Sequence, residues 1–444
     1  MMTFQANAAL PKYFLAGILA FAGLPTLADT FPLPLPGTDV IGELRVVMAR
    51  QEDTLLDIAR RYNLGYNEIT DANPTVDPWL PGAGTPVLLP TQFILPNVPR
   101  QGIVLNIATM RMFYYPMPKP GESPVVITHP VGIGKEGWST PLGATKVVSK
   151  QKDPTWNVPV SIQEEHAKKG EPLPSVVPPG PDNPLGQYAF RLGLPSYLIH
   201  GTNKPSGIGM RVSHGCIHLY PEDIARLYDQ IPVGVSVQIS NQPYLAGWRD
   251  GTLYLETHKP LEEDAKALDG NLTPVVNVII GATGERRRDI NWRNVIRITR
   301  RGGGYPLPIS ANSPALEDII TDLPLVNEQR ETPAPASVVP AHSANAEKND
   351  APSPSSEVAA FDAKRWYVQA GNFKNMGKAH RLTAMLRHLG PPIPALHVAA
   401  PGGYRVLAGP FISKTEAQSH QKLIQVRLGL ETFIKPPEIK RQIN

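Results

Sequence analysis

The most informative part of the sequence is Ile199-His200-Gly201-Thr202, followed by Ser213-His214-Gly215-Cys216-Ile217-His218. These two segments bring the chain's single cysteine close in sequence to three histidines. An imidazole beside a thiol favours the thiolate, which is the reactive nucleophile. Glycines let the main chain approach a substrate, and amide N–H groups near Gly215 and Cys216 can then hold an oxyanion. The segments therefore predict a cysteine nucleophile whose sulfur is ionised beside an imidazole.

Two other interpretations of Cys216 stay open from the residues alone. A lone cysteine is often a small buried apolar residue, and a histidine after a strand is often a satisfied polar side chain. Three histidines and one thiolate also match the donor types of a zinc site. The zinc interpretation leaves the neighbouring glycines unexplained, so we expect no metal and no cofactor. The clustering of histidines around Cys216 favours catalysis.

Length and composition limit the remaining possibilities. The 444 residues have room for two to four domains at roughly 100–200 residues each. Lys and Arg number 43 against 39 Asp and Glu, and the net charge of +4 is too small to predict a nucleic-acid partner. The 49 prolines, about 11% of the chain against a usual ~5%, indicate long connecting segments. A single cysteine excludes an intramolecular disulfide and any site with several thiolates.

The first residues have the pattern of a secretory signal. Lys12 precedes an apolar run over residues 13–24, and the small residues Thr26 and Ala28 stand just before a possible cleavage point. This run is shorter than the ~20 residues that cross a bilayer as a helix. An uncleaved, short membrane anchor is the alternative. We expect residues 1–28 to be a signal peptide, and the mature chain to be exported and to have no transmembrane anchor.

Residues 43–90 have the pattern of a small module made of a strand, two helices and a strand. Asp53 and Thr54 can cap a first helix, and a second helix over residues 67–72 ends at Asn73-Pro74. A larger domain follows over residues 101–260, where Gly and Pro separate short β-rich runs, as in a sandwich or a partly closed barrel. Its expected strands are 103–107, 112–115, 124–129, 144–149, 197–200 and 235–239. Its one clear helix begins at Pro221.

The C-terminal part of the chain divides into three segments. Residues 261–301 form an extension whose structure is uncertain, with possible strands at 275–280 and 295–298. Residues 302–363 are rich in Pro, Ala, Ser and Glu, which predicts a flexible linker. Residues 364–434 have the order strand, helix, strand, strand, helix, strand of a split βαβ arrangement. The predicted fold class is multidomain α+β, with a β-rich central domain between a small βααβ module and a βαββαβ module.

Residues 199–239 resemble the signature of the YkuD-type (ErfK/YbiS-like) L,D-transpeptidases, enzymes that cross-link or decorate bacterial peptidoglycan. The motifs that carry the resemblance are His-Gly-Thr at 200–202, Ser-His-Gly-Cys at 213–216 and Pro-Glu-Asp-Ile at 221–224. The similarity extends to Asn106, to Arg111-Met112 and to the stretch from Gly132 to Gly143. It implies that residues 101–260 are the L,D-transpeptidase catalytic domain.

The resemblance also implies roles for individual residues. Cys216 would be the nucleophile and His200 the base, with the carbonyl of Gly201 fixing the tautomer of that imidazole. The residues expected to bind the oxyanion or the substrate are Ser213, His214, Gly215 and Gly201. Members of the family usually carry arginine two positions after the nucleophile, where this chain has His218, so the role of His218 stays open.

The two flanking modules resemble peptidoglycan-binding domains. Residues 43–90 resemble a LysM domain, which binds glycan that contains N-acetylglucosamine. Residues 364–434 resemble a SPOR domain, which recognises peptidoglycan strands without stem peptides at division sites; Tyr367-Val368-Gln369-Ala370-Gly371 carries part of this resemblance. The alternative for each module is a structural domain that has no ligand.

The implied reaction begins when Cys216 attacks a tetrapeptide stem, releases D-alanine and forms a thioester. The acceptor can be another stem, giving a 3-3 cross-link, the lysine of an outer-membrane lipoprotein, or a free D-amino acid. The partners would be glycan strands and stems in the periplasm, with enrichment at the division septum. Two alternatives remain open: a non-catalytic septal peptidoglycan-binding protein, and a cysteine carboxypeptidase that passes the acyl group to water.

Overall fold

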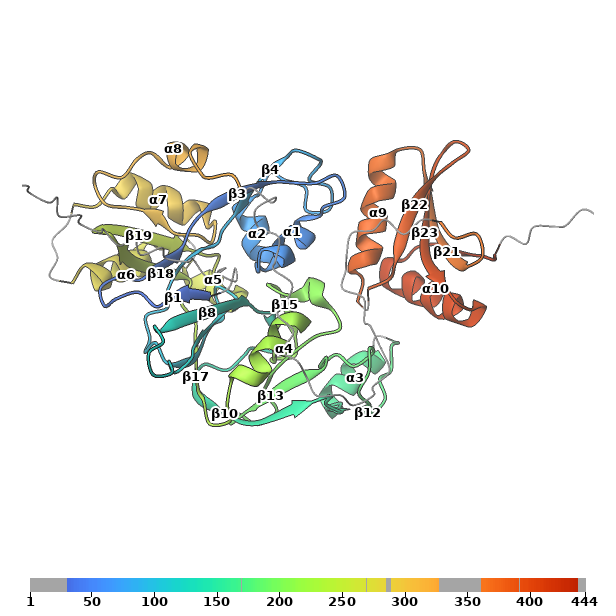
Figure 1. The fold of residues 1–444 in the computed structure, drawn as a ribbon, viewed down its shortest axis with the longest axis horizontal. Coiled ribbons are helices and arrows are strands. Elements are labelled where there is room, and N and C mark those ends of the chain that lie inside the picture. The colour runs from blue at the N-terminus through green and yellow to red at the C-terminus, as the bar shows by residue number, and fades with distance from the viewer. Residues whose placement is uncertain are drawn as a thin grey trace, which may run out of the picture.

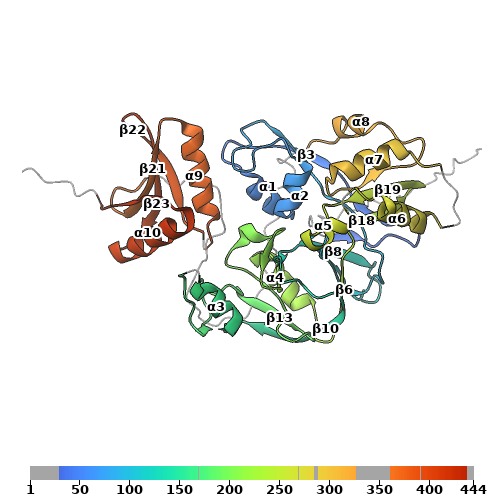
Figure 2. The ribbon, with the colours of Figure 1, turned by 180° about the vertical axis from the view of Figure 1, so that it is seen from behind.

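A computed structural model describes residues 30–168, 170–268, 270–284, 289–326, 361–390 and 392–437. The β-rich central domain, the N-terminal module and the extension after residue 240 are gathered into one part of the molecule (Figure 1). The C-terminal module forms the other part, beside helices α1 and α2 (Figure 2). The predicted signal peptide lies outside the described residues. Among those residues, no helix has both the length and the apolar character needed to cross a membrane.

The N-terminal module has the predicted order of two strands and two helices. Its elements are β3 (Arg45–Met48), α1 (Leu55–Arg61), α2 (Tyr66–Ala72) and β4 (Pro86–Leu89). Thr54 accepts a hydrogen bond from the Asp57 amide, and the Asp57 carboxylate accepts one from the Thr54 amide, so the predicted cap forms a complete capping box. Strands β3 and β4 pair antiparallel.

Nine strands of the central domain form one mixed sheet. In spatial order they are β1 (Thr30–Pro32), β8 (Val125–Pro130), β7 (Arg111–Tyr115), β6 (Gly102–Asn106), β17 (Ser236–Ser240), β10 (Gly143–Lys152), β13 (Tyr188–Leu192), β14 (Leu198–His200) and β16 (Ile217–His218). The pairs β6–β17 and β14–β16 are parallel, and the others are antiparallel. The six strands expected from the sequence are all present within a few residues.

Strands β6 and β7 are buried on both faces, which explains their continuous apolar runs. On one face, Ile103 and Met112 belong to the same core as Ile224 and Leu227 of helix α4 (Pro221–Gln230). On the other face, alternate residues such as Val104 share a core with the N-terminal module. Side chains of a strand point alternately to its two faces, so one strand can serve two cores.

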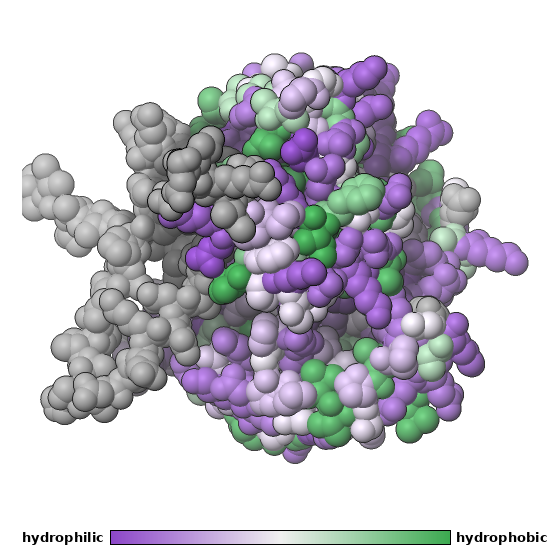
Figure 3. Space-filling model, turned by 90° about the vertical axis from the view of Figure 1, so that its right-hand side faces the viewer, coloured by the Kyte–Doolittle hydropathy of each residue, from purple (hydrophilic) through white to green (hydrophobic). Residues whose placement is uncertain are grey.

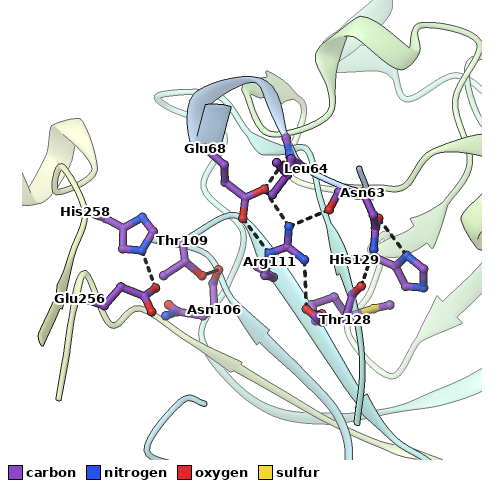
Figure 4. A network of polar contacts seen from close by, with 12 residues as sticks. Asn63, Leu64, Glu68, Asn106, Thr109, Arg111, Thr128, His129, Glu256 and His258 are labelled. Atoms are coloured by element: carbon purple, nitrogen blue, oxygen red, sulfur yellow. Dashed lines mark hydrogen bonds and ion pairs between the residues drawn. The ribbon is translucent and has the colours of Figure 1, made fainter. Parts of the chain in front are cut away.

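A buried ion pair joins the N-terminal module to this sheet. The guanidinium of Arg111 in β7 donates to the carboxylate of Glu68 in α2, with N···O distances of 2.6 and 2.8 Å (Figure 4). Arg111 also donates to the Asn63 carbonyl and the Thr128 hydroxyl. The side chains of Arg111 and Glu68 are only 1% and 6% exposed. The N-terminal module is therefore attached to the central domain by an ion pair that is buried between the two.

Several shorter elements of the central domain were not expected from the sequence. They are β9 (Ile133–Gly134), β11 (Trp156–Asn157), α3 (Val160–Lys168), β12 (Val176–Val177), the 3-10 turn Pro205–Gly207 and β15 (Arg211–Ser213). Helix α3 buries only Ile162, so it has no apolar stripe that a sequence pattern could reveal.

The extension is mainly helical, so the possible strands at 275–280 and 295–298 are wrong. Its helices are α5 (Glu262–Leu268), α6 (Thr273–Thr283), α7 (Trp292–Arg301) and α8 (Leu316–Thr321). Val275 and Ile279 are buried one helical turn apart, as are Val295 and Ile298. The helices pack with a separate sheet of β18 (Tyr244–Arg249), β19 (Thr252–Thr257) and β20 (Leu307–Pro308). The sheet of the central domain therefore ends at Ser240, before the expected boundary at 260.

The first part of the segment at 302–363, predicted to be a flexible linker, is ordered. Residues 302–326 are ordered against the extension, where Tyr305, Leu307 and Ile309 are almost fully buried. Residues 327–360 lie outside the described part of the chain. Because the segment is rich in Pro, Ala, Ser and Glu, its composition does not reveal the few apolar side chains that attach its first part to the extension.

The C-terminal module has the predicted βαββαβ order. Its elements are β21 (Trp366–Phe373), α9 (Met376–His388), β22 (Ala395–Ala400), β23 (Gly403–Phe411), α10 (Lys414–Leu428) and β24 (Phe433–Lys435). The sheet order is β22-β23-β21-β24, and both helices contribute to its core. Figure 3 shows the face of the molecule on the right-hand side of Figure 1, where this module lies. That face is mostly hydrophilic, with small scattered apolar groups.

Candidate active site

The parallel pairing of β14 and β16 places the two informative segments side by side. Ile199 pairs with Ile217, and His200 pairs with His218. Cys216 lies in the short loop between β15 and β16, and His200 is the last residue of β14. Cys216 and His200 line one cavity of about 1230 Å³. The fold therefore brings the predicted nucleophile and base to a common space.

The imidazole of His200 has a defined tautomer. Its Nδ1 lies 2.6 Å from the Gly201 carbonyl oxygen. A carbonyl can only accept a hydrogen bond, so Nδ1 carries the proton and Nε2 is left as the basic nitrogen. Burial lowers the pKa of His200 to about 4, although hydrogen bonds to the carbonyls of Gly201 and Leu185 favour the protonated form. His200 is therefore neutral near pH 7.

The thiol of Cys216 is half-buried, in surroundings that disfavour the ionised sulfur expected from the sequence. Its Sγ lies 3.7 Å from the Ser196 carbonyl oxygen. Burial raises the pKa of Cys216, although a hydrogen bond from the main chain of Leu198 favours the thiolate. Desolvation thus disfavours the charged forms of both Cys216 and His200.

Hydrogen bonds hold the loop that carries Cys216. The hydroxyl of Ser213 donates to the Cys216 carbonyl at 2.6 Å and accepts from the Gly215 amide at 3.1 Å. The hydroxyl of Thr140 donates to the Gly215 carbonyl at 2.9 Å. The Gly215 amide, expected to bind an oxyanion, is therefore occupied by Ser213. Among the described residues, the amide of Cys216 has no hydrogen-bond acceptor.

Glycine is required at position 215. Its φ of +102° is a conformation that residues with a Cβ rarely adopt. A Cβ built there would also lie 2.8 Å from Cε1 of Tyr197. Gly215 therefore permits both the turn and the close approach of Tyr197 beside the nucleophile.

A charged network positions His214. Its Nε2 lies 2.9 Å from Oε2 of Glu165 in α3 and 3.1 Å from Nζ of Lys135. Lys135 itself donates to Glu165 at 2.6 Å. The ring of Trp138 meets His214 edge-on, with 4.8 Å between ring centroids. Burial lowers the pKa of His214, and Lys135 acts in the same direction, while Glu165 opposes both.

His218 is a half-buried residue that lies against His200. The centroids of the two rings are 4.5 Å apart. Burial, followed by the neighbouring His200, His214 and Lys204, lowers the pKa of His218 well below its usual value. The position therefore does not supply the permanent positive charge that an arginine would.

The structure thus brings Cys216, His200, Ser213, His214, Gly215, Gly201 and His218 into one region. The sequence reasoning missed Glu165, Lys135, Trp138 and Tyr197 as contributors. Trp138 lies within the 132–143 stretch already singled out, whereas Glu165 and Tyr197 had no signal in the sequence. No group of three or more His, Cys, Asp or Glu residues is arranged to hold a metal ion in the part of the chain that the structure describes.

Comparisons with known proteins identify the family of the chain. Residues 100–239 match the model of the L,D-transpeptidase catalytic domain, and residues 362–436 match the SPOR domain. A relative from Salmonella typhimurium, the probable L,D-transpeptidase ErfK/SrfK, is 39% identical over 301 residues, which are 66% of this chain and 94% of the relative.

The chain belongs to the YkuD-type L,D-transpeptidase family.

Two further relatives come from Escherichia coli. The probable L,D-transpeptidase YbiS is 40% identical over 282 residues, covering 61% of this L,D-transpeptidase and 90% of the relative. The probable L,D-transpeptidase YcfS is 42% identical over 260 residues, covering 57% and 80% respectively. This L,D-transpeptidase therefore combines a catalytic domain of the YkuD type with a SPOR domain after residue 361.

Proposed function

We propose that this L,D-transpeptidase acts on tetrapeptide stems of peptidoglycan through a thioester on Cys216. The observation that carries the proposal is the tautomer of His200. Its Nδ1–H is held by the Gly201 carbonyl, which leaves Nε2 as the basic nitrogen, and His200 lines the same cavity as Cys216. A neutral imidazole can take the thiol proton as the sulfur attacks, so a preformed thiolate is not required.

In the first half of the reaction, Sγ of Cys216 bonds to the carbonyl carbon that precedes the terminal D-alanine. The thiol proton moves to Nε2 of His200. The amide of Cys216, which has no acceptor among the described residues, is the donor that we assign to the oxyanion. When the C–N bond breaks, His200 returns the proton to the leaving nitrogen. D-alanine departs, and the acyl group stays on sulfur as a thioester.

In the second half, an amine attacks the thioester and loses a proton to His200. The C–S bond breaks, and His200 gives the proton to the departing sulfur, which restores the Cys216 thiol. The energy of the original peptide bond is retained in the thioester, so no nucleotide is consumed. We propose a stem amine or a lipoprotein lysine as the acceptor. We assign His214, held by Glu165 and Lys135, to the acyl pocket beside Cys216.

The flanking modules support a location in the cell wall. We propose that the SPOR domain binds glycan strands and enriches the protein at the division septum in the periplasm. We propose that the βααβ module at residues 43–90 is a LysM domain. Its four elements have the order expected for that domain, and the ion pair between Arg111 and Glu68 attaches it to the catalytic domain.

The test is to incubate the purified protein with a defined disaccharide tetrapeptide and to identify the products by mass spectrometry. We expect release of D-alanine together with a dimer joined through the acceptor amine. The matched control is Cys216→Ala, which should release no D-alanine. A protein that binds the glycan but releases no D-alanine would refute the proposal, and release that yields only the free tripeptide acid would identify a carboxypeptidase.

A further inference from the structure

The SPOR domain is held against the N-terminal module by polar contacts of helix α9. Nε2 of His388 lies 3.2 Å from the Thr54 hydroxyl and 3.4 Å from the Asp57 carboxylate. Arg381 donates to the Asp77 carboxylate. Although burial raises the pKa of Asp57, the hydrogen bond from His388 and the charge of that residue lower it to about 2. These contacts fix the end of α9 next to α1.

The same end of α9 also contacts the catalytic domain. The hydroxyl of Ser206 donates to the His388 carbonyl at 2.9 Å. Gly390 lies against the aliphatic part of Lys204, because a Cβ built on Gly390 would be only 2.1 Å from Cγ of that lysine. The SPOR domain therefore contacts both the N-terminal module and the catalytic domain. These contacts together fix its position relative to the catalytic domain.

This position makes the SPOR domain one wall of the cavity that holds Cys216. The SPOR residues that line the cavity are Gly390, Ser419, Lys422, Leu423, Val426 and Arg427. The volume of about 1230 Å³ exceeds the range of roughly 300–1,000 Å³ that is usual for small-molecule sites. Helix α10 thus encloses a space that is large enough for a peptide and leaves that space unfilled.

The wall formed by α10 is positively charged. Lys422 and Arg427 face the cavity from the SPOR domain, and Lys204 faces it from the catalytic domain. Arg427 lies 3.6 Å from Glu171, and within the described residues Lys422 has no ion-pair partner. Burial lowers the pKa of Lys204, and the charge of Arg427 lowers it further, whereas Glu171, which also lines the cavity, opposes both effects. An anionic group bound here would relieve this repulsion.

We infer that helix α10 of the SPOR domain supplies a subsite for the carboxylates of the peptide substrate, with Lys422 and Arg427 as its ligands. The inference rests on the proposed function and extends it, because the SPOR domain then takes part in substrate binding as well as in targeting. A stem held through its carboxylates at α10 reaches toward Cys216 along the same cavity. Lys422 and Arg427 act in binding only and take no part in the chemical step.

The test uses the full-length protein and measures KM and kcat for D-alanine release from the tetrapeptide. We expect Lys422→Ala and Arg427→Ala each to raise KM about five- to tenfold, the size of effect of a lost charge-assisted contact, with kcat unchanged within twofold. The control is Lys414→Ala, at the start of the same helix and outside the cavity lining, which should leave KM unchanged.

A second substrate separates a carboxylate subsite from a general effect on the fold. The tetrapeptide with its free carboxylates amidated should show a raised KM with the unaltered protein, and the KM ratio of the two substrates should fall toward one in Arg427→Ala. An unchanged KM in both variants would overturn the inference, and so would a higher kcat/KM, which would mark α10 as a barrier. In either case, D-alanine release by the unaltered protein would still support the proposed function. Absence of release by the unaltered protein would instead refute both.

Discussion

Replacement of Glu68 by alanine should destabilise the catalytic domain even though Glu68 lies in the N-terminal module. The carboxylate accepts hydrogen bonds from Nε and Nη2 of Arg111 at 2.6 and 2.8 Å and from the Gly65 amide at 2.6 Å. Its removal leaves the buried guanidinium in contact with neutral acceptors only, the Asn63 carbonyl and the Thr128 hydroxyl (Figure 4). Loss of one partner of a buried ion pair costs about 3–5 kcal/mol.

The assay is urea unfolding of the protein, followed by tryptophan fluorescence and by residual D-alanine release. We expect Glu68→Ala to lower the free energy of unfolding by about 3–5 kcal/mol in both signals, because the module and the sheet share one core. The matched control is Glu222→Ala, which breaks the exposed ion pair with Arg60 at the same junction and should cost at most ~1 kcal/mol.

A loss of less than about 1 kcal/mol in Glu68→Ala would refute the reasoning. A separate early transition in fluorescence, with enzymatic activity lost at the original urea concentration, would refute it as well. The double variant Glu68→Leu with Arg111→Met offers a further check, since replacing both partners by apolar residues should recover most of the lost stability.

Three further predictions concern the site and its surroundings. Burial lowers the pKa of His200 to about 4, so the base stays neutral above that pH. The value of kcat/KM at pH 5.5 should therefore be at least about nine-tenths of its value at pH 7. If His200 had the ordinary pKa of 6.5, only about a tenth of that value would remain at pH 5.5. Gly215→Ala, strained at its φ of +102° and crowded by Tyr197, should lower the free energy of unfolding by about 1–3 kcal/mol and reduce kcat at least tenfold in the D-alanine assay. A chain truncated after residue 326 should keep kcat within a few-fold while its KM rises, and fluorescence microscopy should show loss of septal enrichment; septal enrichment unchanged by the truncation would contradict the SPOR assignment.

The parts of the fold that were predictable are those whose residues follow one periodic pattern. The helices and strands of both flanking modules have apolar residues at regular spacing and clear end signals, such as Thr54 before α1. In the central domain, Pro221 marks the start of α4 in the same way. Strands β6 and β7 were recognisable because both faces are buried and each strand contains a continuous apolar run.

The parts that were wrong depend on packing partners that are distant in sequence. The run of Val and Ile in α6 fits a strand or a helix equally well, and only its contacts with the β18–β19 sheet decide between them. Tyr305 and Ile309 attach a segment whose composition is otherwise that of a linker. These errors arise from tertiary packing that overrides local preference.

The residues that gather at the candidate site were predictable from their motifs, but the effect of their surroundings on charge was not. The motifs placed Cys216 near three histidines, as the structure does, whereas the ionised thiol expected beside His200 is disfavoured. Burial decides this outcome, since it disfavours the charged form of both groups. Glu165 was missed because nothing in its local sequence relates it to His214.

The most direct test of the thioester is intact-mass spectrometry of the protein mixed with the tetrapeptide donor and quenched in acid within the first turnover. We expect a species heavier than the free protein by the mass of the donor minus D-alanine, located on Cys216 by peptide mapping and absent in Cys216→Ala. His200→Ala should form the same adduct much more slowly. Release of D-alanine with no adduct on the protein, or an adduct that persists in Cys216→Ala, would contradict a thioester on this sulfur.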